Sequence, residues 1–140
     1  YVKYGDKVYS PVVEKGEADL IVSFEQLEAA RSLPYLRKGG TIITSTQKLD
    51  PMPVITGATT YPEDIFNQFR EAGVDFVSVN ALELAEQAGS AKASNVVLMG
   101  VVSTKMSIEK EVWLKALEEC VPAKFLELNK KAFELGRECY

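Results

Sequence analysis

Three short apolar runs alternate with helical segments over the first 80 residues, and this alternation constrains the fold more than any other feature of the chain. The apolar runs occupy residues 18–24, 41–45 and 75–79, and apolar residues recur at helical spacing in residues 25–36 and 61–72. Because parallel strands are joined by helical crossovers, the pattern predicts a mostly parallel sheet with helices on both faces. The first run is predicted to be buried on both faces of that sheet.

The last third of the chain is predicted to be helical and to wrap the sheet. Residues 94–106 are apolar almost all round, which is typical of a buried helix. Ser107 is predicted to cap the next helix and Pro122 to open the last one, whose buried stripe includes Phe125. We therefore predict one α/β domain over residues 1–140, with three layers (α/β/α) and a mostly parallel, Rossmann-like sheet.

The remaining segments are predicted to be turns or edge structure. Residues 1–11 alternate in polarity around a Gly-Asp pair, which predicts a hairpin or a pair of edge strands. Gly39 and Gly40 are interpreted as a helix stop. Residues 47–61 are predicted to form a loop with a short extended piece at residues 54–55.

The composition of the chain disfavours several classes of function. The 140 residues carry a formal net charge of −4, whereas a protein that binds nucleic acid needs lysine and arginine to neutralise phosphates. No apolar stretch approaches the roughly 20 residues that span a bilayer, and no signal-peptide pattern opens the chain. We therefore expect no nucleic-acid or membrane partner and a cytoplasmic location.

The chain contains no histidine, which removes the commonest general base and the commonest metal ligand. Its two cysteines, Cys120 and Cys139, cannot by themselves complete a four-ligand zinc or iron–sulfur site. They are interpreted as reduced thiols on helices, as is usual in a cytoplasm. No catalytic residue and no metal ligand is predicted.

Candidate binding residues come from the expected topology, because ligands of open α/β sheets bind beyond the carboxyl ends of the strands. No G-x-G-x-x-G turn or Walker-type phosphate loop is present. Most carboxylates fall on helices beside lysines and are interpreted as solvated faces. The cleft candidates are Glu25, Ser45, Thr46 and Asn80, each at or just after the end of a predicted strand.

Further candidates lie away from those strand ends. Asn95 stands at the start of a very apolar helix, where a cap or a first-turn hydrogen bond to the backbone is the simpler interpretation. A role for Asn95 in the cleft is the alternative. Tyr9, Ser10 and Pro11 join an aromatic side chain to a rigid turn, and they are predicted to be interface residues.

Four stretches of the sequence, weak when taken singly, together indicate one protein family through their order and spacing. They are residues 2–11 (VKYGDKVYSP), 16–25 (GEADLIVSFE), 95–100 (NVVLMG) and 124–136 (KFLELNKKAFELG). With them the chain resembles the gamma domain of pyruvate/2-oxoacid ferredoxin oxidoreductases. Residues 27–36 fit the indolepyruvate branch of that family, in which the resembled chain is the beta subunit.

One part of the resembled domain has no counterpart in this sequence. Family members begin with a strand and a glycine-rich G-x-G-G-Q-G turn that leads into a helix, and no residue here matches that turn. The resemblance therefore implies that residues 1–140 are an incomplete gamma domain that lacks the first strand and helix. A sheet without an inner strand exposes unpaired backbone groups, so we expect a partner, a second copy or the missing segment itself to cover them.

The resemblance also implies a function. In the resembled enzymes a 2-oxoacid is decarboxylated on thiamine diphosphate, electrons pass through iron–sulfur clusters to ferredoxin, and the acyl group passes to coenzyme A. In the indolepyruvate type, thiamine diphosphate and the clusters belong to the large partner subunit. The chain is thus expected to be a subunit that holds no cofactor, is inactive alone, and assembles with that large subunit.

Two other readings remain open from the residues. A free-standing nucleotide-binding domain of Rossmann type would share the fold but requires a phosphate-binding turn. A structural or regulatory interaction module would require no site at all.

Overall fold

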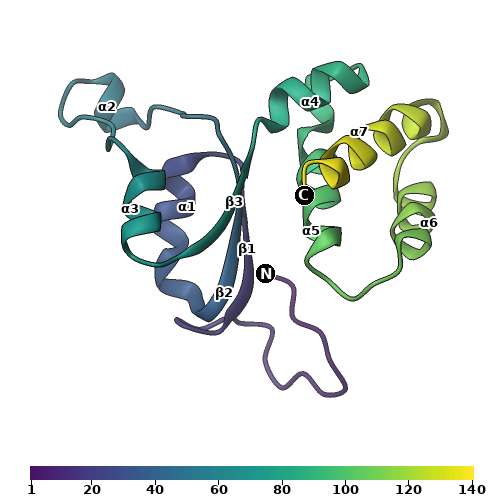
Figure 1. The fold of residues 1–140 in the computed structure, drawn as a ribbon, viewed down its shortest axis with the longest axis horizontal. Coiled ribbons are helices and arrows are strands. Elements are labelled where there is room, and N and C mark those ends of the chain that lie inside the picture. The colour runs from purple at the N-terminus through teal and green to yellow at the C-terminus, as the bar shows by residue number, and fades with distance from the viewer.

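The computed structural model describes residues 1–140 and contains a three-stranded parallel sheet in the order β1-β2-β3. The strands are β1 (Ala18–Ser23), β2 (Leu36–Ser45) and β3 (Asp75–Val79). One face is covered by α1 (Gln26–Ser32) and α3 (Ile65–Glu71), and the other by α4 (Ala81–Ala88), α5 (Ser94–Thr104), α6 (Lys110–Cys120) and α7 (Leu126–Glu138) (Figure 1). The predicted α/β class, the parallel sheet and the helices on both faces are confirmed.

Strand β2 alternates its side chains between two separate cores. Ile42 packs with Phe69 between the sheet and the α1/α3 layer, and Ile43 packs in a larger core that includes Val97 and Phe133. Ile42 and Ile43 are both completely buried. Because successive residues of a strand point to opposite faces, these two neighbours anchor the two helical layers to one sheet.

Strand β1 lies at an edge of the sheet, since it pairs only with β2. Val22 pairs in register with Ile43 and so points toward the α5 side, yet it is 40% exposed, and Phe24 just beyond the strand is 54% exposed. The prediction that this strand is buried on both faces is therefore wrong. No second strand and no helix covers its outer side.

Gly39 and Gly40 lie inside β2, so their interpretation as a helix stop is wrong. A Cβ on Gly40 would lie 2.9 Å from the carbonyl oxygen of Asp19 and 3.0 Å from that of Ala18, because β1 passes close to this point. Gly39 has a φ of 76°, which glycine adopts without a steric penalty. The two glycines let β2 begin at Leu36, earlier than predicted.

Helices α5 and α7 touch backbone to backbone. A Cβ on Gly136 would overlap the carbonyl oxygen of Val97, and a Cβ on Gly100 would overlap the carbonyl oxygen of Phe133. Two glycines at facing positions therefore permit the backbones of these two helices to approach closely. Seven residues of α5 are buried, which confirms that it is an internal helix.

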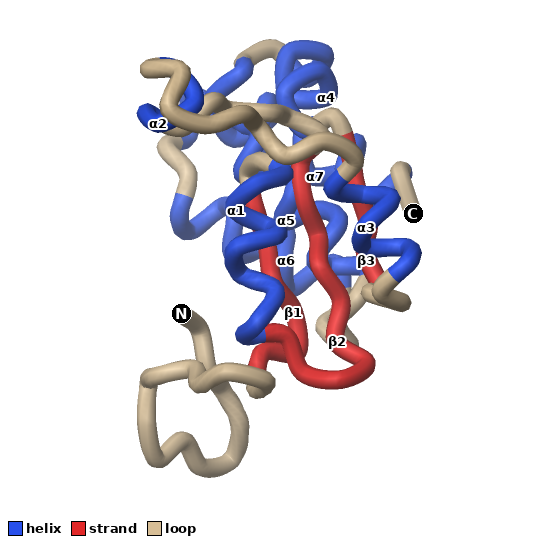
Figure 2. The backbone as a smooth tube through the Cα atoms, turned by 90° about the vertical axis from the view of Figure 1, so that its left-hand side faces the viewer, coloured by secondary structure: helices blue, strands red, loops and turns tan.

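Residues 1–17 form no strand, so the predicted hairpin is wrong. The segment leaves the sheet as an irregular loop, visible at the bottom of Figure 2. It is held by Lys3, whose ammonium donates to the carbonyl of Val12 at 3.1 Å and to the carboxylate of Glu17 at 3.2 Å. An isolated two-stranded hairpin is only marginally stable in water. No strand of the sheet lies beside residues 1–17, so nothing would stabilise a hairpin there.

The connection between β2 and α3 also differs from the prediction. The expected extended piece lies in a short helix, α2 (Met52–Ile55). Helix α3 begins at Ile65 rather than at residues 61–64, because Asp64 takes a left-handed conformation with a φ of 55°. This conformation cannot continue a right-handed helix.

The C-terminal helices differ from the prediction at their starts. Helix α6 begins at Lys110 with Glu109 at its cap position, so the predicted cap at Ser107 is wrong. Pro122 precedes a 3-10 turn that leads into α7, and Phe125 in that turn is 47% exposed rather than buried. Two further 3-10 turns, η1 (Leu33–Tyr35) and η2 (Ala91–Ala93), follow α1 and precede α5.

Candidate functional site

Glu25 lies directly after β1 and caps helix α1. Its carboxylate accepts hydrogen bonds from the backbone amides of Leu27 at 2.9 Å and Glu28 at 2.5 Å. These amides have no partner within the helix, and an acidic side chain is favoured at the positive end of the helix dipole. Glu25 is 5% exposed. This cleft candidate is therefore already engaged in starting a helix.

The hydroxyl of Tyr61 completes the surroundings of Glu25. It donates a hydrogen bond of 2.9 Å to Glu25 Oε2, and it lies 3.0 Å from the backbone amide of Leu27. Burial, and then the neighbouring Glu25 carboxylate, raise the pKa of Tyr61 to about 12. Tyr61 therefore stays protonated and remains a donor at neutral pH.

Hydrogen bonds around Gln26 and Thr46 join the carboxyl ends of all three strands. The side chain of Gln26 donates to the carbonyl of Thr46 at 2.7 Å, and its backbone amide donates to the carbonyl of Gln47 at 3.0 Å. The amide of Thr46 donates to the carbonyl of Val79 at the end of β3, at 2.9 Å. The residues that follow β1, β2 and β3 thus form one continuous edge.

Ser45 and Asn80 belong to the same edge but make different contacts. Ser45 is 2% exposed, and its Oγ has no hydrogen-bond partner. Asn80 is exposed and caps α4, because its Oδ1 accepts from the amide of Glu83 at 3.2 Å. Asn80 also lines a groove of about 370 Å³ with Cys139 and Tyr140. Partial burial of its sulfur, and then the nearby Glu138 carboxylate, raise the pKa of the otherwise exposed Cys139 thiol there.

The structure brings the four strand-end candidates to one edge, as predicted, but not the other candidates. Asn95 is exposed on α5, and its side chain makes no hydrogen bond within the chain, so the expected cap or first-turn bond is absent. Tyr9 is 85% exposed in the N-terminal loop, near Pro11. The Oγ of Ser10 accepts a hydrogen bond from the amide of Val12 at 3.2 Å. A binding role for any of these residues stays a prediction.

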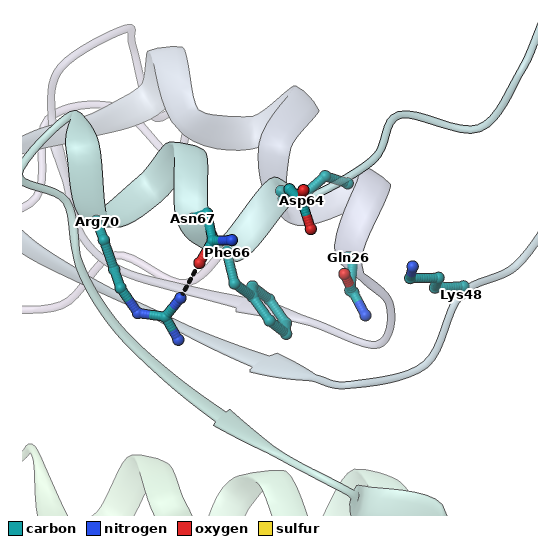
Figure 3. A pocket seen from close by; sticks show the side chains of 7 residues that line it. Gln26, Lys48, Asp64, Phe66, Asn67 and Arg70 are labelled. Carbon is teal, nitrogen blue, oxygen red and sulfur yellow. Dashed lines mark hydrogen bonds between the residues drawn. The ribbon is translucent and has the colours of Figure 1, made fainter.

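A second groove lies at the same edge, on the side of α1 and α3 (Figure 3). Its volume is about 280 Å³. Side chains of both charges line it together with one aromatic ring: Gln26, Lys48, Asp64, Phe66, Asn67 and Arg70. None of these residues was a sequence candidate. Gln26 directly follows the candidate Glu25, and Lys48 lies two positions after the candidate Thr46. This nearness in sequence is the only feature that could have predicted them.

The structure contains no cluster of three or more histidine, cysteine, aspartate or glutamate side chains of the kind that holds a metal ion. Cys120 and Cys139 are both exposed free thiols. No helix is long and apolar enough to cross a bilayer. The carboxyl edge of the sheet offers hydrogen-bonding and charged groups, which suit binding and positioning.

Comparison with protein families decides the class of the chain. The family model described as pyruvate ferredoxin/flavodoxin oxidoreductase matches residues 1–139. The chain belongs to the pyruvate ferredoxin/flavodoxin oxidoreductase family. The resemblance found in the sequence is thereby confirmed, and with it membership in a family of oxidoreductases.

Relatives of the chain include indolepyruvate oxidoreductase subunits. The chain is 38% identical to the indolepyruvate oxidoreductase subunit IorB of Thermococcus kodakarensis, over 97% of the chain and 70% of that protein. It is 35% identical to the subunit IorB of Archaeoglobus fulgidus, over 97% of the chain and 69% of that protein.

A solved structure supports the fold of this oxidoreductase-family chain. The keto/oxoacid ferredoxin oxidoreductase gamma subunit from Geobacter sulfurreducens matches with a TM-score of 0.65 and 22% identity. The match covers 89% of this chain, and the chain spans 64% of the length of that structure. At this identity the likeness concerns the fold alone.

Proposed function

We propose that the chain is part of the small subunit of an indolepyruvate (aryl 2-oxoacid) ferredoxin oxidoreductase and that it is inactive alone. The observation that carries this proposal is the 38% identity with a subunit IorB over 97% of the chain. The complex would oxidise the 2-oxoacid, reduce ferredoxin and pass the acyl group to coenzyme A.

The cofactors of such a complex do not fit the residues of this chain. An iron–sulfur cluster needs about four thiolate ligands, whereas the chain has two exposed cysteines, one on α6 and one at the end of α7. We therefore place the clusters and thiamine diphosphate in the large partner subunit. The chain would then contribute a surface for assembly.

The surface around β1 supports a role in assembly. The outer edge of β1 carries unpaired backbone groups, and Val22 and Phe24 are exposed beside it. Such an edge is a template for strand pairing, so it suits contact with a partner, a second copy or further residues of the same subunit. That residues 1–140 form an incomplete domain stays a prediction, which the reading frame upstream of Tyr1 tests.

No observation favours the alternative, a free-standing nucleotide-binding domain. In that fold the phosphate binds at the amides of the helix that follows the first strand. Here the carboxylate of Glu25 already accepts hydrogen bonds from the amides of Leu27 and Glu28. A phosphate at this position would meet a buried negative charge.

Reconstitution tests the proposal. The full-length subunit is co-expressed with its large partner, and indolepyruvate-dependent reduction of ferredoxin is measured with and without it. We expect co-purification and activity only when both polypeptides are present, in the cytoplasmic fraction of the cell. Turnover by the large subunit alone at the full rate, or by this chain alone, would contradict the proposal.

A further inference from the structure

Three large apolar side chains project from the connection between β2 and α3. Leu49 is 60% exposed, Met52 is 69% exposed and Ile55 is 67% exposed, and together they are called the α2 patch here. Neither core of the molecule includes any of them. Figure 1 shows α2 standing clear of α1 and α3. The α2 patch therefore contributes nothing to the cores of this chain.

Hydrogen bonds within the connection hold the backbone of α2 in a compact turn. The amide of Ile55 donates to the carbonyl of Pro51 at 3.1 Å, and the amide of Thr56 donates to the carbonyl of Met52 at 2.9 Å. The rings of Pro51 and Pro53 fix two φ angles of the same turn. Because the backbone is already ordered, binding of a partner at the α2 patch costs little further conformational entropy.

Both ends of the connection are tied to the start of α1. The backbone amide of Gln26 donates to the carbonyl of Gln47 at 3.0 Å, and the hydroxyl of Tyr61 donates to the carboxylate of Glu25 at 2.9 Å. These bonds hold the α2 patch at the carboxyl edge of the sheet, near the end of β1 and the exposed Phe24. The α2 patch thus extends the surface around β1 that supports a role in assembly.

The segment that carries most of the α2 patch has no charge. Charged residues make up 26% of the chain, yet residues 51–62 contain none. Charged side chains flank this run on both sides: Lys48, Asp50, Glu63 and Asp64. An apolar centre depleted of charge, with a polar rim, is typical of a protein–protein interface. The surface that complements it is an uncharged, apolar pocket with a polar border.

The size of the α2 patch argues against a second copy of the chain as the occupant. Three side chains of this size present roughly 200–400 Å² of apolar surface, whereas a stable interface buries about 800 Å² on each partner. Contact between two such patches would therefore be too small. Insertion of the patch into a different site on a second copy would be a head-to-tail contact, which does not close in a pair. A projecting patch of this kind fits a concave surface on a different polypeptide.

We propose that the α2 patch anchors the chain in an apolar pocket of the large partner subunit. This inference rests on the proposed function, because that function supplies the partner. Met52 and Ile55 fill the pocket, and the flanking charges stay in contact with water at its border. A few buried apolar anchors supply most of the binding energy of an interface. The adjoining surface around β1 enlarges the contact toward the area of a stable complex.

Charge substitutions in the full-length subunit test the proposal. Met52→Glu and Ile55→Glu should each weaken association with the large subunit at least about 30-fold, because each buries an unpaired charge at the anchor. Val112→Glu is the matched control and should associate as wild type does, since Val112 is 56% exposed on α6, on the other face of the sheet. Biolayer interferometry measures the dissociation constants. The melting temperature of the free subunit should stay the same in all three variants, because the three side chains are exposed.

The outcomes separate this inference from the proposed function. Association of the wild-type subunit with unchanged affinity in both patch variants would refute the inference and leave the proposed function standing. A wild-type subunit that does not associate with the large subunit at all would refute both. A lower melting temperature of the free patch variants would show that other residues of the same subunit cover the patch. Self-association that the patch variants abolish would show that a second copy covers it, and either result overturns the inference.

Discussion

The hydroxyl of Tyr61 donates a 2.9 Å hydrogen bond to the carboxylate of Glu25, although the two residues are 36 positions apart. The bond joins the long connection between β2 and α3 to the first turn of α1. Glu25 therefore has two roles: it caps the N-terminus of α1, and it accepts a hydrogen bond from the connection between β2 and α3.

Replacement of Tyr61 by phenylalanine should destabilise the fold by about 1 kcal/mol, because it deletes one hydrogen bond to a buried carboxylate. Urea unfolding monitored by circular dichroism measures the change. Tyr4→Phe is the control, since Tyr4 is 71% exposed and its hydroxyl has no partner within the chain. Equal midpoints for both variants would show that the Tyr61 hydroxyl contributes nothing.

The contribution of Tyr61 should also depend on pH. Burial first, and then Glu25, raise its pKa to about 12 in the fold, above the value of about 10 for a free phenol. Because the folded pKa is the higher one, the stabilisation is complete below pH ~10 and is lost as the pH rises toward about 12. The difference in free energy of unfolding between wild type and Tyr61→Phe should therefore narrow as the pH rises from about 10 to about 12. A constant gap would argue against the raised pKa.

Ser45→Ala should stabilise the chain by roughly 1 kcal/mol, because the buried Oγ of Ser45 has no hydrogen-bond partner. Ser103→Ala is the matched comparison. The Ser103 hydroxyl donates to the carbonyl of Gly100 at 2.6 Å and accepts from Arg137 at 2.7 Å, so its loss should cost about 1–2 kcal/mol. Thermal unfolding of the two variants should shift in opposite directions, and a shift in the same direction contradicts the assignment.

Gly136→Ala should destabilise the fold by about 1–3 kcal/mol, because the added methyl group would overlap the backbone of α5 at Val97. In an exposed helix the same change would be favourable, so the sign of the effect is diagnostic. Lys131→Ala, at an exposed position of the same helix, should change the free energy of unfolding by less than about 0.5 kcal/mol. A stabilised Gly136→Ala variant would mean that the two helices lie further apart.

The sheet and the inner helices could be predicted from the sequence because their signals are local. A short apolar run such as residues 75–79 predicts a strand without reference to the rest of the chain. Likewise, apolar residues on nearly all sides of α5 predict that this helix is buried. The hairpin at residues 1–11 was predicted wrongly because alternation shows only that a strand can form. Whether it does form depends on a neighbouring strand, and residues 1–17 have none.

The candidate site was predictable to the extent that topology determines it. Glu25, Thr46 and Asn80 meet at one edge because the carboxyl ends of parallel strands lie together. Tyr61 and Asp64 could not be found in the same way. Their positions depend on the path of the connection after β2, and on a left-handed residue for which the sequence carries no glycine signal.

The two edges of the sheet are not equivalent. At β3 the hydroxyl of Tyr140 donates to the carbonyl of Ser78 at 3.0 Å, so the last residue of the chain lies against that side. At β1 no such contact exists. A strand can therefore add at β1 without displacing another part of the chain, and two copies joined through this edge would form a closed pair.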